Sequence, residues 1–302
     1  TSTLSIPEMG TPFVLGMLME AQPKTFSDLL QISGLSHGTD VWLGNARELI
    51  VGGTASVLQT VGCRDDIMLY LISMGLDPKM SFKIMEAVRK GKVKKGGFQE
   101  GWVEAMEEHG VPAWYIESLA KIGYLFPKAH AVAYVMMAFR IAWFKVHEPL
   151  AFYATFFTIR AKAFDAEFCC AGKEAVERKI HEIENNKDAT AVEQNLLVTL
   201  EVCYEFYLRG FHFDTIDIYR SDASKFIITE GGLLPPLISV HGLGEAAAQD
   251  TVEKRKGKTF ISVEEFSMCC SKLSKTHIEQ LKALGAFAGM ADTSQVNLFD
   301  GL

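Results

Sequence analysis

A lysine stands near the start of a long apolar segment, where helix physics would favour an acid. Proline fits the first position of a helix, so we expect a helix from Pro127 to Phe144 with Lys128 at its positive pole. A cation at this position opposes the helix dipole during folding. Together with free backbone N–H groups, however, it makes a site for a polyanion such as a triphosphate.

Aromatic residues accompany this lysine at helical spacing. Phe126, His130 and Tyr134 are four residues apart, so they lie roughly on one face of the expected helix. That face would offer rings beside an anion site, which suits a nucleotide held by its base and its phosphates. The alternative is that Lys128 extends its ammonium group to solvent and that the rings belong to the core.

Composition and charge limit the possible classes of protein. With 302 residues and 48% hydrophobic content, the chain can form one large or two medium domains, and we expect two. The net charge of −7 argues against a protein that holds nucleic acid by its overall charge. Between Lys79 and Lys95, however, seven basic residues face one acid, Glu86, which is either a solvated helix face or a phosphate-binding surface.

Cysteine spacing and apolar runs indicate the cellular location of the protein. None of the six cysteines shows the two-residue spacing of zinc sites, so we expect reduced, mostly buried thiols, a cytoplasmic location and no metal held by cysteine. The apolar run from Ala131 to Phe157 contains Arg140, Lys145 and Glu148, and falls short of the ~20 uncharged residues of a membrane span. No signal peptide precedes this run, so we expect no membrane partner.

The first two thirds of the chain have the pattern of a helical domain. Apolar periodicity predicts helices at residues 25–30, 65–74, 78–90, 101–108 and 112–122, before the long helix. The segment 33–40 reads as a loop whose small residues would let a ligand approach, or as a plain turn capped by Thr39 or Asp40. Arg64, Asp65 and Asp66 read as a capping cluster, since adjacent carboxylates diverge on a helix.

A change in composition near Gly210 marks a second domain. Short β-like runs at 211–219 and 225–229 precede Gly242-Leu243-Gly244 and an alanine-rich segment, which matches the helix-hairpin-helix pattern. The two glycines would allow a tight hairpin whose N–H groups point at a DNA phosphate. Basic residues add charge near that surface, in this unit and in a weaker second unit at 271–281: Lys254, Arg255, Lys256, Lys258, Lys272 and Lys275. An ordinary helix–turn–helix is the alternative.

The last residues form a short peptide with two apolar anchors. Gln295 is followed three and four positions later by Leu298 and Phe299, a spacing that suits docking on another protein. A disordered terminus is the alternative.

In these three features the chain resembles the C-terminal part of a PolC-type DNA polymerase III alpha subunit, a bacterial C-family replicative polymerase. The resemblance covers nearly the whole chain and is most specific in four segments: Ser33 to Ala46, Cys63 to Met68, Phe126 to Ala131 and Gly231 to Pro236. It implies a mainly α fold with minor β. The implied parts are a helical fingers domain at 1–209, a small α+β domain with tandem helix-hairpin-helix units at 210–290, and a tail at 291–302 that binds a sliding clamp.

Roles follow from the resemblance residue by residue. Ser36, His37, Lys128, His130 and Tyr134 would line the pocket for a deoxynucleoside triphosphate, with Phe126 beside the base. Lys83 and Arg89 are triphosphate partners on charge alone. Primer-template DNA, the clamp and other replisome subunits are the implied partners.

The resemblance also implies what this chain lacks. The family's palm holds two Mg²⁺ ions with three aspartates, and neither Asp65 with Asp66 nor Asp214 with Asp217 matches those motifs. We therefore expect no catalytic or metal-binding residue here, and no polymerase activity from this piece alone. The competing hypotheses are a noncatalytic DNA-binding replication scaffold and a helical enzyme of other metabolism.

Overall fold

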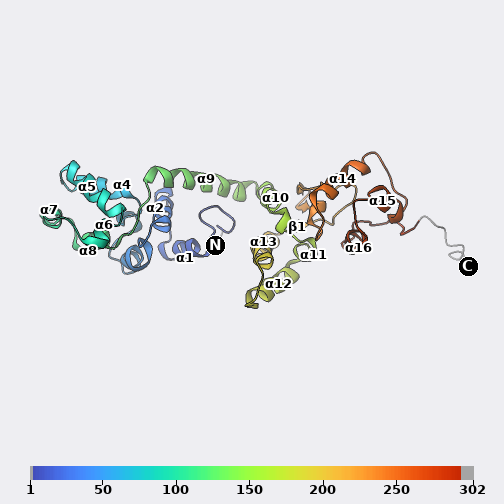
Figure 1. Ribbon diagram of the computed structural model, residues 1–302, viewed down its shortest axis with the longest axis horizontal. Helices are drawn as coiled ribbons and strands as arrows, with labels where there is room; N and C mark the ends of the chain where they lie inside the picture. The colour runs from blue at the N-terminus through green and yellow to red at the C-terminus, as the bar shows by residue number, and fades with distance from the viewer. Residues whose placement is uncertain (1–2, 294–302) are drawn as a thin grey trace, which may run out of the picture. The chain divides into compact units, whose positions relative to one another are not determined.

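The computed structural model describes residues 3–293, and Figure 1 labels most of its helices and strand β1. Two compact units divide the chain, Thr1–Trp143 and Phe144–Leu302. The described residues are mainly helical with one small sheet, so the predicted fold class is confirmed.

The first unit is built from short helices. Thr25 begins one of them by accepting a hydrogen bond from the Asp28 N–H at 3.1 Å, and Asp77 begins another by accepting from the Met80 N–H at 2.8 Å. The predicted helices are confirmed, most of them with ends shifted by only a few residues. Their bounds are α1 (Pro12–Ala21), α2 (Phe26–His37), α3 (Arg47–Val51), α4 (Arg64–Ser73), α5 (Pro78–Arg89), α6 (Lys92–Gly96), α7 (Trp102–Glu108), α8 (Ala113–Lys121) and α9 (Lys128–His147).

The predicted loop at residues 33–40 is wrong in its first half, because α2 continues to His37. Gly34 is there for packing and not for a turn. A Cβ added at Gly34 would lie 2.5 Å from the carbonyl oxygen of Gly62, so only glycine lets that backbone approach the helix. The chain leaves the helix at Gly38, and Thr39 then pairs with Tyr124 as an isolated antiparallel bridge.

The second unit combines helices with a three-stranded sheet. The central strand β3 (Gly232–Leu234) pairs in parallel with β1 (His212–Phe213) and antiparallel with β2 (Ile227–Ile228). The two predicted β-like runs therefore contain strands, but β3 was missed because its glycine and flanking prolines suggest a turn. The helices are α10 (Pro149–Ile159), α11 (Ala166–Cys169), α12 (Lys173–Asn185), α13 (Ala191–Leu208), α14 (Glu245–Arg255), α15 (Val263–Cys269) and α16 (Lys275–Ala283).

An aromatic core joins these helices to the sheet. Phe157 of α10 lies 5.9 Å from Phe206 of α13, 5.3 Å from Phe213 of β1 and 5.6 Å from Phe226, measured between ring centroids. Such packing contributes about 0.5–1.5 kcal/mol per ring pair beyond simple burial. Because this core crosses residue 210, the compact units divide after Trp143 and not at the predicted 209–210 boundary, which remains a prediction about functional regions.

Helix α9 begins in the first unit and ends in the second. Its 20 residues are long and apolar enough to cross a bilayer by length and composition alone, which core helices of soluble proteins also satisfy. Its last turn carries Lys145, which is buried and lies 2.7 Å from the Glu205 carboxylate of α13. This end of α9 is therefore packed into the second unit by a charge pair.

Replacing Gly34 by alanine is expected to destabilise the chain by about 1–3 kcal/mol, because the new methyl group must displace the Gly62 backbone. Gly16 is the matched control, since it also lies inside a helix and nothing lies within 4 Å of an added Cβ. Gly16→Ala is expected to raise stability by about 0.5–1 kcal/mol. Urea unfolding of both variants checks this; equal midpoints would contradict the packing role of Gly34.

Candidate nucleotide and duplex interface

The start of α9 is held by two carboxylates from the first turn of α4. The backbone N–H of Lys128 donates to Oδ2 of Asp65 at 2.7 Å, and its ammonium group donates to Oδ1 of Asp66 at 2.9 Å. The backbone N–H of Arg64 also donates to the Phe126 carbonyl at 3.0 Å. The positive helix pole and the lysine thus already have anionic partners within the chain.

A strip of aromatic rings lies at the start of the same helix. Phe126 stacks on His130 with centroids 5.2 Å apart, and His130 contacts Tyr134 at 4.6 Å. Tyr124 and His37 each lie edge-on to Phe126, at 5.5 and 5.6 Å. The predicted common face is confirmed, and the structure adds Tyr124, which the sequence analysis missed. We call these five residues the ring strip.

Local electrostatics keep Lys128 charged. Its partial burial would lower its pKa, but the hydrogen bond and the charge of Asp66 outweigh this effect and raise the pKa. Burial, with the nearby Asp66 carboxylate, raises the pKa of the Cys63 thiol to about 12. The side chain of Lys128 is 40% exposed and that of Asp66 only 14%, so a cation reaches the surface above a covered anion.

The other predicted nucleotide residues lie in different settings. The Ser36 hydroxyl donates to the Ser33 carbonyl of its own helix at 2.9 Å, and the His37 ring forms a short contact with the Glu8 carboxylate. These two side chains therefore have partners within the chain, although the ring of His37 belongs to the ring strip.

Among the described residues, only some basic side chains around α5 are free of acidic partners and could bind a phosphate group. Arg89 and Lys90 both bond Glu86, and these bonds lower the pKa of Glu86 to about 2. The carbonyl of Arg89 accepts from the Leu125 N–H at 3.3 Å, which places the end of α5 next to the ring strip. Lys83 is exposed on α5, and no described contact joins it to the strip.

The hairpin of the second unit depends on one glycine more than the other. Gly242 has a φ of +75°, which only glycine adopts without strain, whereas Gly244 has an ordinary φ of −75° and begins α14. Leu243 is buried between them. The element before the hairpin is a single turn at Leu237–Ser239, shorter than the helix that the pattern implies.

Lysines of the two hairpin units converge on Asp250. Lys254 of α14 and Lys272 of the second hairpin lie 3.1 and 3.2 Å from its carboxylate. Lys256 pairs with Glu253 at 2.6 Å, and the ammonium group of Lys258 donates to the Cys269 sulfur at 3.1 Å. Lys275 is exposed at the start of α16. Asp250 therefore links the first hairpin to the second.

The predicted role of Arg255 at the DNA surface is wrong. Its side chain is buried, and its guanidinium group donates to the Ile218 carbonyl at 2.5 Å and to the Ser221 carbonyl. Burial lowers its pKa. Because Arg255 lies on the inner face of α14, it ties this helix to the 217–221 turn.

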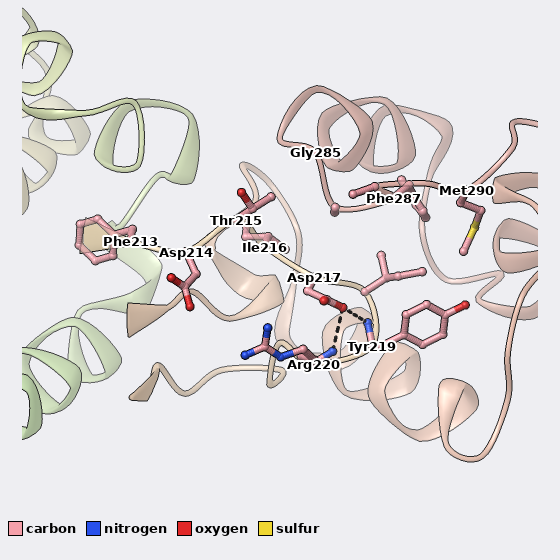
Figure 2. A pocket seen from close by; sticks show the side chains of 13 residues that line it. Phe213, Asp214, Thr215, Ile216, Asp217, Tyr219, Arg220, Gly285, Phe287 and Met290 are labelled. Carbon is pink, nitrogen blue, oxygen red and sulfur yellow. Dashed lines mark hydrogen bonds between the residues drawn. The ribbon is translucent and has the colours of Figure 1, made fainter. Parts of the chain in front are cut away.

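Two cavities lie near these sites. One of about 350 Å³ adjoins the Lys128–Asp66 pair and is also lined by Gln31, Tyr70 and Trp114. Figure 2 shows the other, of about 580 Å³ in the second unit, between residues 213–220 and 285–290. There the Asp217 carboxylate accepts from the backbone N–H groups of its own turn, so it stabilises the fold.

The predicted peptide of Gln295, Leu298 and Phe299 lies outside the described residues.

Replacing Arg255 by alanine is expected to lower the free energy of unfolding by about 1.5–3 kcal/mol, since the variant leaves buried carbonyls unpaired. Lys256→Ala, one position on, removes only an exposed ion pair and is expected to leave the unfolding midpoint nearly unchanged. Thermal unfolding of the two variants compares them. Equal stability would contradict the structural role of Arg255.

The chain is similar to known proteins along most of its length. Residues 1–110 match the bacterial DNA polymerase III alpha subunit finger domain, and residues 210–296 match the helix-hairpin-helix motif. The chain is 54% identical to DNA polymerase III PolC-type of Caldanaerobacter subterraneus over 298 residues, 53% to that of Bacillus cereus over 300 and 50% to that of Streptococcus pneumoniae over 307. These alignments cover 98%, 99% and 100% of this chain but 21% of each relative. Over nearly its whole length the chain is similar to a segment of PolC-type DNA polymerase III, and it corresponds to about a fifth of the length of these relatives.

Proposed function

We propose that this chain is the nucleotide- and duplex-binding part of a replicative DNA polymerase. In template-directed synthesis it would hold the incoming deoxynucleoside triphosphate in the first unit and the primer-template duplex in the second. The observation that carries this proposal is the ring strip at the start of the helix whose first residue is the charged Lys128.

The nucleotide would use both parts of this surface. Aromatic faces stack on any base, which suits a site that must accept all four nucleotides. The triphosphate would meet the exposed ammonium group of Lys128, with Arg89 at the adjoining end of α5. Because Asp65 already accepts from the first N–H of α9, the lysine side chain would contribute more to triphosphate binding than the positive end of the helix. A correct pair would permit the fingers to close, and a mismatch would not.

The duplex would lie against the hairpins of the second unit. Gly242 shapes the first hairpin, and the exposed Gly244 opens α14 with no side chain between its backbone and solvent. Lys254, Lys258 and Lys272 add positive charge along this face. Such contacts are independent of sequence, as a replicative enzyme needs.

Catalysis itself would come from outside this chain. Among residues 3–293 no group of three or more His, Cys, Asp or Glu side chains is placed to hold a metal ion, so the proposal assigns Mg²⁺ to palm carboxylates elsewhere. The isolated chain should give no primer extension, and incorporation of nucleotide would contradict this part. Binding of a sliding clamp through Gln295, Leu298 and Phe299, contact with other replisome subunits and a cytoplasmic location complete the proposal.

Lys128→Ala in the PolC-type polymerase that carries this segment is expected to raise the KM for deoxynucleotides roughly tenfold, because a charge-assisted phosphate contact is lost. Lys24→Ala is the control, since this exposed lysine precedes α2 at the end opposite His37. Steady-state primer extension measures both variants. An unchanged KM and kcat for Lys128→Ala would remove this residue from the nucleotide site and favour a noncatalytic DNA-binding scaffold.

Gly244→Thr tests the duplex surface. Threonine is a good helix N-cap and an added Cβ meets nothing within 4 Å, so stability should be retained. Its side chain would nevertheless separate the backbone from a DNA phosphate. We expect weaker duplex binding, measured by fluorescence anisotropy at several salt concentrations. If the variant bound duplex as the parent chain does, the hairpin would not be the contact.

A further inference from the structure

We propose that Asp66 is a positioning residue for nucleotide binding: one oxygen of its carboxylate holds the Lys128 ammonium group where the triphosphate arrives. This inference rests on the proposed function and names a further residue of the same site. Asp66 itself need not touch the nucleotide.

The two oxygens of Asp66 serve different purposes. Oδ2 accepts hydrogen bonds from the Gly62 N–H at 3.1 Å, the Cys63 N–H at 2.9 Å and the Gln31 side-chain amide at 3.1 Å. These bonds cap α4 and tie it to α2. Oδ1 accepts from the Lys128 ammonium at 2.9 Å. The folding role and the lysine-holding role are therefore carried by different atoms of one side chain.

The anchor for Lys128 is itself fixed. The Gln31 side chain is buried, and its Nε2 also donates to the Thr60 carbonyl at 2.5 Å. This amide and two backbone N–H groups leave the Asp66 carboxylate little freedom to rotate. A rigid carboxylate can determine the position of a flexible lysine, whereas a mobile one could not.

Lys128 needs such an anchor, because its surroundings do not confine it. Its side chain is 40% exposed, and it lines the cavity of about 350 Å³ that adjoins the ion pair. Without Asp66 the ammonium group could turn into that cavity or into solvent. With Asp66 as its partner, the ammonium group keeps N–H donors for a further acceptor.

A competing hypothesis predicts the opposite effect of Asp66 on nucleotide affinity. Asp66 could act as an anion that occupies Lys128 and repels the triphosphate, in which case its removal would tighten nucleotide binding. Positioning is favoured because three N–H donors already share the negative charge of Asp66, and because its carboxylate lies below the surface that the lysine reaches.

Asp66→Asn in the full-length polymerase separates these readings. The amide oxygen can replace Oδ2 in capping α4, while the amide NH₂ group faces the ammonium group and cannot accept from it. We expect kcat/KM for deoxynucleotides to fall roughly tenfold to a hundredfold, mainly through KM, with the Kd for primed duplex unchanged. Unchanged or tighter nucleotide binding would overturn the proposal.

Asp28→Asn is the matched control. Asp28 caps α2 in the same way, accepting from the Thr25 N–H at 2.9 Å, but it holds no lysine ammonium group. It changes a capping carboxylate to the same amide, and it should leave KM unchanged. If Asp66→Asn does not fold, Asp66→Glu retains the anion, displaces it by one methylene group and should raise KM by a smaller factor; an unchanged KM would count against the proposal.

A double variant distinguishes this inference from the function on which it rests. In a Lys128→Ala background, Asp66→Asn should cause no further rise in KM, since the group it positions is gone. An additive effect would show that Asp66 acts by another route. If Lys128→Ala alone had no effect, the proposed nucleotide site would fail; if only Asp66→Asn had none, this inference alone would fail.

Discussion

The pairing of the α4 carboxylates with the start of α9 determines the arrangement of the first unit's candidate site. Asp65 caps the first N–H of α9, that of Lys128, and Asp66 fixes the ammonium group of the same residue. An uncompensated lysine at a positive helix pole would oppose folding, so the two acids make this site compatible with a stable helix. The ring strip follows from the same arrangement, since His130 and Tyr134 lie on the helix that the acids hold and Phe126 lies just before its first residue.

In the second unit, too, an acidic side chain pairs with basic residues of the candidate site. Its basic residues would repel one another if they stood alone, and Asp250 reduces this by pairing with Lys254 and Lys272. Arg255 is withdrawn from the surface to hold the 217–221 turn. The positive charge left for a partner is therefore smaller than the sequence suggests, and it is placed by specific contacts.

The sequence predicted the local features well. Helix boundaries follow from capping residues such as Thr25 and Asp77, and the common face of the rings follows from helical periodicity. Contacts between segments far apart in the sequence could not be predicted from these local patterns. Asp65 lies 63 positions from Lys128, and nothing in its spacing marks it as the cap of a different helix. The burial of Arg255 and the close approach at Gly34 are likewise properties of packing, which local patterns do not encode.

Photochemical cross-linking tests the central claim most directly. A deoxythymidine triphosphate analogue with a photoreactive group on its base would be irradiated on a primed template with the polymerase that carries this segment, and the attached peptide mapped by mass spectrometry. The account predicts attachment within residues 124–134, suppressed by excess unmodified nucleotide. Attachment confined to the second unit, with residues 124–134 unlabelled, would contradict it.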